Sequence, residues 1–152
     1  MLYKEKLSEL REENNLKQKD LAKLINTDRS VYGRYEKEYQ IIPIKHLNTL
    51  CNYFKVSIDY IFSFTSQKTY PDLNPEIDKK IAGERLKDFR KEHKITQEKL
   101  ATILNTSQST IADYERGKNY IPTPFLYTIS KNYQISADYL LGKTNKNSLS
   151  IQ

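Results

Sequence analysis

The sequence contains two copies of one unit, and this repeat constrains the fold more than any other feature. Sliding the chain along itself by 79 residues aligns about 59 positions without a gap, and close to one third of them are identical. The identical pairs run along the whole match and include Leu7/Leu86, Arg11/Arg90, Gln18/Gln97, Leu21/Leu100, Ala22/Ala101, Asn26/Asn105, Thr27/Thr106, Ser30/Ser109, Tyr35/Tyr114, Glu36/Glu115, Pro43/Pro122, Leu47/Leu126, Asp59/Asp138 and Tyr60/Tyr139. We therefore expect the same small domain twice, each of about 60 residues, near the lower size limit for a domain that folds alone.

The repeat also predicts how the chain is divided. Residues 1–62 and 79–142 form the two predicted domains. Residues 63–78 contain two prolines and several apolar side chains, which is typical of a stiffened linker that packs on a neighbouring domain. Residues 143–152 are polar, and we expect them to form a mobile C-terminal tail.

Composition excludes several classes of protein. No apolar run approaches the roughly 18 residues that a membrane helix needs, and the acidic start lacks the apolar segment of a secretory signal, so we expect a cytoplasmic protein without a membrane partner. The single cysteine, Cys51, excludes an internal disulfide, and with two histidines it leaves too few ligands for a closed zinc site. No paired carboxylates or nucleophile–base set stands out, so we predict neither an enzyme nor a cofactor.

The chain is basic, which favours an anionic partner. Its 152 residues carry a formal net charge of +6. Residues 1–62 have 11 basic and 9 acidic side chains, whereas residues 79–152 have 13 and 7. The second half of the chain therefore carries most of the positive charge that would attract such a partner.

Apolar residues recur at helical spacing in both copies, and sustained alternation typical of strands is missing. The pattern predicts an all-α fold with five short helices in each copy. The first three helices are expected at about residues 4–14, 18–25 and 28–36, and at about 79–92, 97–104 and 107–116. A fourth helix should follow a proline, and a fifth should begin at Ser57 or Ser136.

Polar residues at the expected helix starts suggest which side chains cap them. Thr96 is a candidate N-cap, as are Thr27 or Asp28 in the first copy and Thr106 or Ser107 in the second. Asn26 and Asn105 suit a tight turn, because asparagine tolerates the left-handed conformation. Before the fourth helix of the second copy, Thr123 is expected as N-cap and Pro124 as the first helical residue.

Two stretches carry a family resemblance. LKQKDLAKLINTDRSVYGRYEKEYQIIP and ITQEKLATILNTSQSTIADYERGKNYIP both resemble the Cro/lambda-repressor-like, or XRE-like, helix-turn-helix family, and VSIDYIF and ISADYLLG resemble the end of the same domain. The match covers about residues 5–62 and 84–142, and the second copy is the closer one. The resemblance implies two tandem lambda-repressor-like five-helix domains, joined by the proline-containing linker, that bind double-stranded DNA sequence-specifically.

The third helix of each copy has a polar face suited to reading bases. Projection at about 100° per residue turns Arg29, Ser30, Gly33, Arg34 and Lys37 away from the apolar face in the first copy. In the second copy the corresponding outward residues are Gln108, Ser109, Ala112, Asp113 and Arg116. Arginine can donate two hydrogen bonds to guanine, and glutamine can pair with adenine. The alternative is that these are simply solvated polar faces.

The resemblance implies a role for each matched residue. The base-reading positions are occupied by Arg29, Ser30 and Arg34, and by Gln108, Ser109 and Asp113. At the start of the second helix, contacts to the DNA backbone and an adjacent base fall to Gln18 and Gln97. Candidate phosphate contacts are Lys37, Arg116, Lys118 and Asn119. Two ion pairs are expected to tie the first helix to the third, Arg11 with Glu36 and Arg90 with Glu115.

Both copies depart from the family pattern. Glu38 stands where the second copy has Gly117, so we expect the third helix of the first copy to be longer or differently turned. Tyr32 fills the core position that holds Ile111 in the second copy. A negative charge in the base-reading row of the second copy, Asp113, would repel phosphates. The sequence does not rank the two copies as DNA readers.

These observations predict a transcriptional regulator, and specifically a repressor that occludes a promoter, because few residues lie outside the two units. One chain could supply both half-sites of an operator, or one copy could bind DNA while the other forms a homodimer. The alternative from another class is a protein-interaction module that binds a toxin, an anti-repressor or polymerase. A further alternative is a protein that coats DNA without sequence preference.

Overall fold

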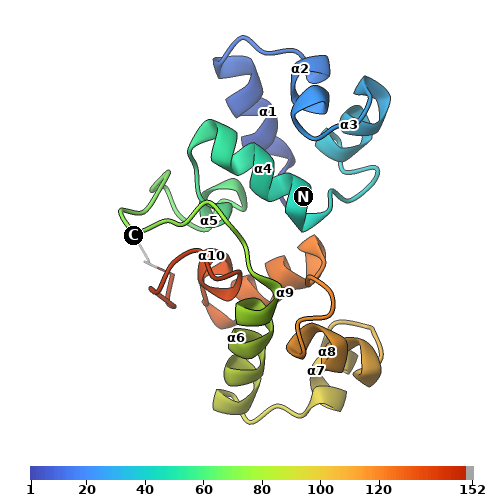
Figure 1. Ribbon diagram of the computed structural model, residues 1–152, viewed down its shortest axis with the longest axis vertical. Helices are drawn as coiled ribbons and strands as arrows, with labels where there is room; N and C mark the ends of the chain where they lie inside the picture. The colour runs from blue at the N-terminus through green and yellow to red at the C-terminus, as the bar shows by residue number, and fades with distance from the viewer. Residues whose placement is uncertain (150–152) are drawn as a thin grey trace.

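The computed structural model describes residues 1–149 and consists of α-helices in two lobes (Figure 1). The first unit contains α1 (Lys4–Glu13), α2 (Gln18–Leu24), α3 (Arg29–Glu36), α4 (Ile44–Phe54) and α5 (Ile58–Ile61). The second contains α6 (Lys79–Glu92), α7 (Gln97–Ile103), α8 (Gln108–Glu115), α9 (Thr123–Tyr133) and α10 (Ala137–Leu140). Residues 1–149 contain no β-strand beyond an isolated antiparallel bridge between Ile135 and Ser148. The all-α prediction of two five-helix units is confirmed.

No helix within this range is long and apolar enough to cross a membrane. Both units instead bury apolar residues at the predicted positions, and these residues belong to one core cluster that spans the two units. The buried residues include Leu7, Leu10, Leu21, Ala22 and Ile25, and Leu86, Phe89, Leu100, Ala101 and Leu104. Cys51 is also fully buried, and burial raises the pKa of its thiol to about 12, so the thiol stays protonated and inert.

Side-chain caps start several helices where the sequence predicts them. The hydroxyls of Thr96, Ser57 and Ser136 each accept a hydrogen bond from the backbone N–H three residues along, at 3.1, 2.9 and 3.1 Å. Asp28 and Ser107, rather than the threonines before them, cap α3 and α8. Each cap satisfies one of the N–H groups that the first helical turn leaves without a partner.

The turn between the second and third helix of each unit is left-handed, as expected. Asn26 has a φ of 53° and Asn105 a φ of 56°. The short turn places α2 against α3 and α7 against α8. This pairing of helices is the helix-turn-helix layout.

The third helix ends in the same way in both units, so our expectation of a different end in the first unit is wrong. The helices α3 and α8 have eight residues each, and Glu38 and Gly117 are both left-handed, with φ of 58° and 76°. Glu38 holds this conformation because its carboxylate accepts hydrogen bonds from the backbone N–H groups of Leu2, Tyr3 and Lys4, at 2.9 to 3.0 Å. The carboxylate thereby caps α1, which has no side-chain cap of its own.

The start of α9 also differs from our expectation, because Thr123 is not its N-cap. Pro122 occupies the N-cap position, and Thr123 is the first helical residue. The hydroxyl of Thr123 instead donates a 2.7 Å hydrogen bond to the carbonyl oxygen of Ile42 in the first unit. Its partner therefore lies across the junction between the units, where the sequence of one unit gives no signal.

The linker packs on the first unit and starts the second. The carbonyl oxygen of Pro75 accepts hydrogen bonds from the side-chain amides of Asn48 and Asn52 in α4, at 3.0 and 2.7 Å. Asp78 caps α6 by accepting from the backbone N–H groups of Lys80 and Ile81. The C-terminal part of the proline-containing segment is thus fixed to α4 on one side and to the start of α6 on the other.

The segments that follow α5 and α10, residues 63–70 and 142–149, are structural copies of one another, and we call them straps. In the first, the backbone N–H of Ser57 donates to the carbonyl oxygen of Lys68 at 2.7 Å. In the second, the N–H of Ser136 donates to the carbonyl oxygen of Asn147 at 2.8 Å. Each strap returns to the start of the last helix of its unit, so the structural repeat extends beyond the expected domain ends.

The second strap corrects our expectation of a mobile tail after residue 142. Lys143 and Thr144 are 1% and 3% exposed, and Thr144 donates to both carboxylate oxygens of Asp72 at 3.0 Å. Lys143 and Thr144 are held because their side chains find partners in the first unit and the linker, whereas residues 145–148 are exposed. Residues 150–152 of the expected tail lie outside the described residues.

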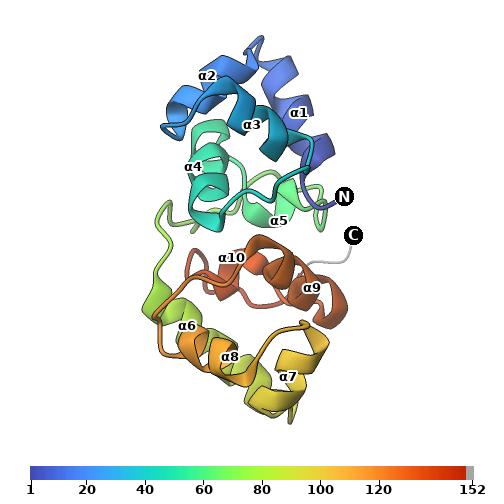
Figure 2. The ribbon, with the colours of Figure 1, turned by 90° about the vertical axis from the view of Figure 1, so that its right-hand side faces the viewer.

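The two units meet through α5 and α10 and are related by an approximate two-fold axis. Figure 2 looks along this axis: a half-turn in the plane of the picture exchanges α1 with α6, α2 with α7, and α4 with α9. The two short helices α5 and α10 lie side by side at its centre in both ribbon views. This arrangement sets how the two helix-turn-helix units face.

Candidate nucleic-acid interface

Both helix-turn-helix units open on the same face of the molecule. The four helices α2, α3, α7 and α8 lie along the right-hand side of Figure 1, and that side faces the viewer in Figure 2. The helices α3 and α8, whose outward residues the sequence analysis selects, are therefore presented together rather than on opposite sides.

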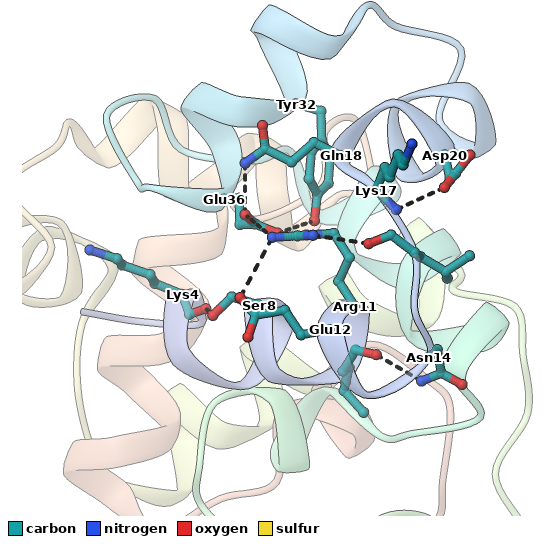
Figure 3. A network of polar contacts seen from close by, with 12 residues as sticks. Lys4, Ser8, Arg11, Glu12, Asn14, Lys17, Gln18, Asp20, Tyr32 and Glu36 are labelled. Carbon is teal, nitrogen blue, oxygen red and sulfur yellow. Dashed lines mark hydrogen bonds and ion pairs between the residues drawn. The ribbon is translucent and has the colours of Figure 1, made fainter.

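A buried network fixes the orientation of α3 (Figure 3). The expected ion pair forms: Arg11 Nε lies 2.7 Å from Glu36 Oε1, and the guanidinium also donates to Glu36 Oε2 at 3.2 Å. Gln18 Nε2 and the Tyr32 hydroxyl donate to the same carboxylate at 2.8 and 3.0 Å. Burial raises the pKa of Glu36, but hydrogen bonds from Arg11, Gln18 and Tyr32 outweigh it and hold the pKa below its ordinary value. The network ties α1, α2 and α3 into one rigid group.

The second unit repeats this network with one substitution. Arg90 Nε lies 2.6 Å from Glu115 Oε2, so the second expected ion pair also forms. Gln97 Nε2 donates to Glu115 Oε1 at 3.1 Å. Ile111 replaces the tyrosine of the first unit, so the glutamate has one donor fewer and the core gains an apolar side chain. The bulky Tyr32 of the first unit fits because its hydroxyl has a partner.

The outward face of α3 is cationic and open. Arg29, Ser30, Arg34 and Lys37 are exposed, and together with the half-buried Gln18 they line a surface hollow of about 210 Å³. Arg34 makes a long 3.3 Å hydrogen bond to a glutamine side chain. Within residues 1–149, no ion pair holds Arg29 or Arg34. Their guanidinium groups therefore keep most of their donors available for a ligand.

The outward face of α8 is polar but less cationic. Gln108, Ser109, Arg116, Lys118 and Asn119 are exposed, and Asp113 is half-buried. The guanidinium of Arg116 pairs with the Asp113 carboxylate one turn away. This ion pair neutralises the negative charge of Asp113. It also occupies Arg116, the C-cap of α8, which is the only arginine among residues 108–116. The second half carries more positive charge overall, but the outward face of α8 carries less than that of α3.

The two glutamines at the start of α2 and α7 donate to equivalent glutamates, but their amide oxygens have different surroundings. A Cβ at Gly33 would lie 3.3 Å from Gln18 Oε1, so glycine gives the Gln18 side chain room against α3. Ala112 occupies this position in the second unit, and Gln97 Oε1 there accepts a 3.4 Å hydrogen bond from Gln108 Nε2. The first unit leaves its glutamine oxygen beside the cationic hollow, whereas the second links its two glutamines.

A further side chain on this face, Tyr39, is not among the predicted site residues. Tyr39 is 78% exposed and lines the hollow with Arg29 and Arg34, and the Lys37 ammonium lies 5.8 Å from its ring centroid. It aligns with Lys118 of the second copy, which the sequence analysis did select. That alignment is the signal that would have found it.

Comparison with known proteins agrees with this geometry. A family model described as helix-turn-helix matches residues 7–61, and one described as a helix-turn-helix domain matches residues 83–146. The chain is a tandem pair of XRE-like helix-turn-helix domains. The two matches together span both units of the structure.

Two proteins of Bacillus subtilis (strain 168) are similar to part of this tandem helix-turn-helix chain. The uncharacterized HTH-type transcriptional regulator YobD is 36% identical over 62 residues, which are 41% of this chain and 55% of that protein. The HTH-type transcriptional regulator ImmR is 39% identical over 61 residues, which are 40% of this chain and 48% of that protein. The chain spans about half the length of the curated relatives it matches. No solved structure matches the chain significantly.

Proposed function

We propose that this chain is a sequence-specific double-stranded DNA-binding transcriptional regulator. The observation that carries the proposal is the presentation of α3 and α8 on one face, each held by a buried arginine–glutamate network. A helix-turn-helix protein places its second helix in the major groove, and residues on the outward face of that helix contact base edges. The similarity to two HTH-type transcriptional regulators supports a role in transcription.

The outward residues divide into base-reading and backbone-contacting groups. In the first unit, Arg29 and Arg34 are proposed to donate to guanine, and Ser30 to contact either strand's bases. In the second unit, the corresponding readers are Gln108, Ser109 and Asp113, which suit adenine and cytosine. The proposed phosphate contacts are Lys37, Arg116, Lys118 and Asn119, and Gln18 and Gln97 are proposed to bridge the backbone and a neighbouring base.

We further propose that the protein represses by occluding a promoter. Two helix-turn-helix units on one face would cover more than one turn of the duplex, and polymerase cannot use a promoter covered in this way. The proposal is tested by placing the selected site over a promoter in a purified transcription reaction. Transcription should fall as the site is filled, and a rise would instead indicate an activator.

The binding proposal is tested by selecting random duplex DNA with the purified protein and sequencing what is retained. An enriched motif supports specific recognition. The logarithm of the binding constant should fall linearly with the logarithm of the salt concentration, by roughly 0.9 for each phosphate contacted. Retention of DNA with the same salt slope but no motif would indicate nonspecific coating and would overturn the proposal.

A protein-interaction module is the second candidate, and two exposed apolar side chains favour it. Tyr39 and Ile41 follow α3 and are 78% and 40% exposed, although the neighbouring Ile42 is fully buried. An anti-repressor or polymerase surface could cover them. Absence of any DNA binding at low salt, together with loss of a copurifying protein on Tyr39→Ala, would favour this candidate.

A further inference from the structure

The junction between the units contains a reciprocal pair of helix caps. Asp59 Oδ1 accepts a 2.7 Å hydrogen bond from the backbone N–H of Ala137, the first residue of α10. Asp138 Oδ1 accepts a 2.9 Å hydrogen bond from the N–H of Ile58, the first residue of α5. Each aspartate is fully buried and caps the helix of the other unit. Because the pairs are related by the repeat offset of 79 residues, the caps define the two-fold axis.

The contacts that flank these caps occupy equivalent positions but differ in chemistry. On one side, the rings of Phe64 and Tyr127 pack with centroids 5.0 Å apart. On the other, the ammonium of Lys143 donates to Asn48 Oδ1 at 2.6 Å. Phe64 aligns with Lys143, and Asn48 with Tyr127. One side of the junction is therefore aromatic and the other is polar.

Because of this difference, a first unit pairs better with a second unit than with another first unit, and the same holds for the second unit. Two first units joined in the same way would place Phe64 against Asn48 on both sides. Two second units would place Lys143 against Tyr127 and Lys131 in place of Asn48 and Asn52, so its buried ammonium would lose both amide acceptors and face a like charge. The junction has the approximate two-fold symmetry of an ordinary homodimer, but the junction surfaces of the two units are no longer interchangeable.

We infer that one chain is a covalent pseudo-dimer that engages both half-sites of a single operator, in inverted orientation and with unlike sequences. The inference rests on the proposed function and extends it. The two-fold axis inverts the second recognition helix relative to the first, and the axis runs through the face that presents both helices. The unlike residues on α3 and α8 then read unlike half-sites, about one helical turn apart, or roughly 34 to 36 Å. The buried Asp59 and Asp138 act as positioning residues, because they fix one unit against the other.

The first test uses the wild-type chain with DNA alone. A duplex carrying the selected motif should bind one chain per duplex in native mass spectrometry. Inserting about five base pairs between the half-sites rotates one of them to the opposite side of the duplex, so affinity should fall to that of a single half-site. Linked binding typically adds about 10²-fold or more, so the loss should be at least that large.

The second test loosens the junction with Asp138→Ala, with Asp88→Ala as a control. Asp88 is exposed on α6, so the control removes the same type of side chain without touching the junction. Asp138→Ala should bind an isolated half-site as the wild type does. Its affinity for the intact operator should fall about tenfold or more, and its preference for one spacing should flatten. Asp88→Ala should keep the wild-type spacing preference. If Asp138→Ala does not fold, as circular dichroism would show, the spacing experiment with the wild-type chain still decides.

The outcomes separate this inference from the proposed function. Two chains on each operator, or a motif made of two identical half-sites, would overturn the inference and leave specific DNA binding intact. A selected motif with a single half-site, insensitive to flanking insertions, would do the same. Failure to select any motif would instead overturn the proposed function.

Discussion

Replacing Glu38 with alanine tests whether a distant carboxylate holds both the start of α1 and the end of α3. The side chain accepts hydrogen bonds from three consecutive backbone N–H groups, of Leu2, Tyr3 and Lys4. Losing a side-chain cap of this kind costs about 1–2 kcal/mol. Because alanine keeps a Cβ, the left-handed strain at φ 58° remains in the variant. The expected loss corresponds to a drop in melting temperature of about 2–8 °C for a chain of this size.

Glu38→Gly separates the cap from the backbone strain. Glycine also removes the carboxylate, but it relieves about 1–2 kcal/mol of left-handed strain. Against this, glycine makes the unfolded chain more flexible, which lowers the free energy of unfolding by about 0.5–1 kcal/mol. We therefore expect Glu38→Gly to be more stable than Glu38→Ala, by roughly 0.5–1 kcal/mol.

Thermal unfolding followed by circular dichroism measures both variants, with Glu9→Ala as a control. Glu9 is an exposed acid on α1 and should change the melting temperature little. Equal stability of the alanine and glycine variants would mean that the strain does not exceed the roughly 0.5–1 kcal/mol that glycine loses through its more flexible unfolded chain, and would contradict the expected difference. An alanine variant as stable as the wild type would refute the cap.

Three further predictions concern the site and its support. Replacing Arg29 and Arg34 together by alanine should weaken operator binding by about 1–3 kcal/mol per arginine and relax base preference in one half-site, with unchanged thermal stability. Gel-shift competition with single-base operator variants measures this, and unchanged selectivity would assign base reading to the second unit. Glu36 contributes fully to the free energy of unfolding above its ordinary pKa of 4.5, and this contribution is lost as the pH falls through its lower pKa in the folded state. In Glu36→Gln, the free energy of unfolding should therefore fall less steeply in acid than in the wild type. Urea unfolding from pH 7 to pH 3 checks this, and an unchanged acid slope would contradict it. Gly83→Ala would place a Cβ 2.5 Å from two backbone carbonyl oxygens of α8, so we expect a loss above about 2 kcal/mol in the same assay, and a neutral result would refute the close contact of α6 with α8.

Local patterns predicted most of the helices because their causes lie within one unit. Asn26 and Asn105 turn where asparagine tolerates the left-handed conformation, and Thr96 caps a helix through a backbone N–H three residues away. The ion pair of Arg11 with Glu36 could be predicted because the family resemblance implies a contact between the first and third helices. Whether the outward residues contact DNA stays a prediction.

The features that the sequence did not reveal depend on contacts between distant segments. Glu38 was expected to alter the end of its helix, because only the fold shows that the N-terminus of α1 lies beside it. Thr123 was expected to cap its own helix, but its hydroxyl has a partner in the other unit. Asp59 and Asp138 were noticed only as identical residues. A charged residue shared by both copies within an otherwise apolar final helix was the signal that they serve the junction.

The reciprocal caps between α5 and α10 also bear on how the protein responds to its own abundance. Regulators assembled from separate subunits dissociate on dilution, so occupancy of their sites falls more steeply than concentration itself. A pair held within one chain keeps its partner at any dilution, and occupancy then follows a simple hyperbolic curve. A cell could hold such a protein at very low copy number and still fill its site, but it would forgo the sharp threshold that dimerisation provides.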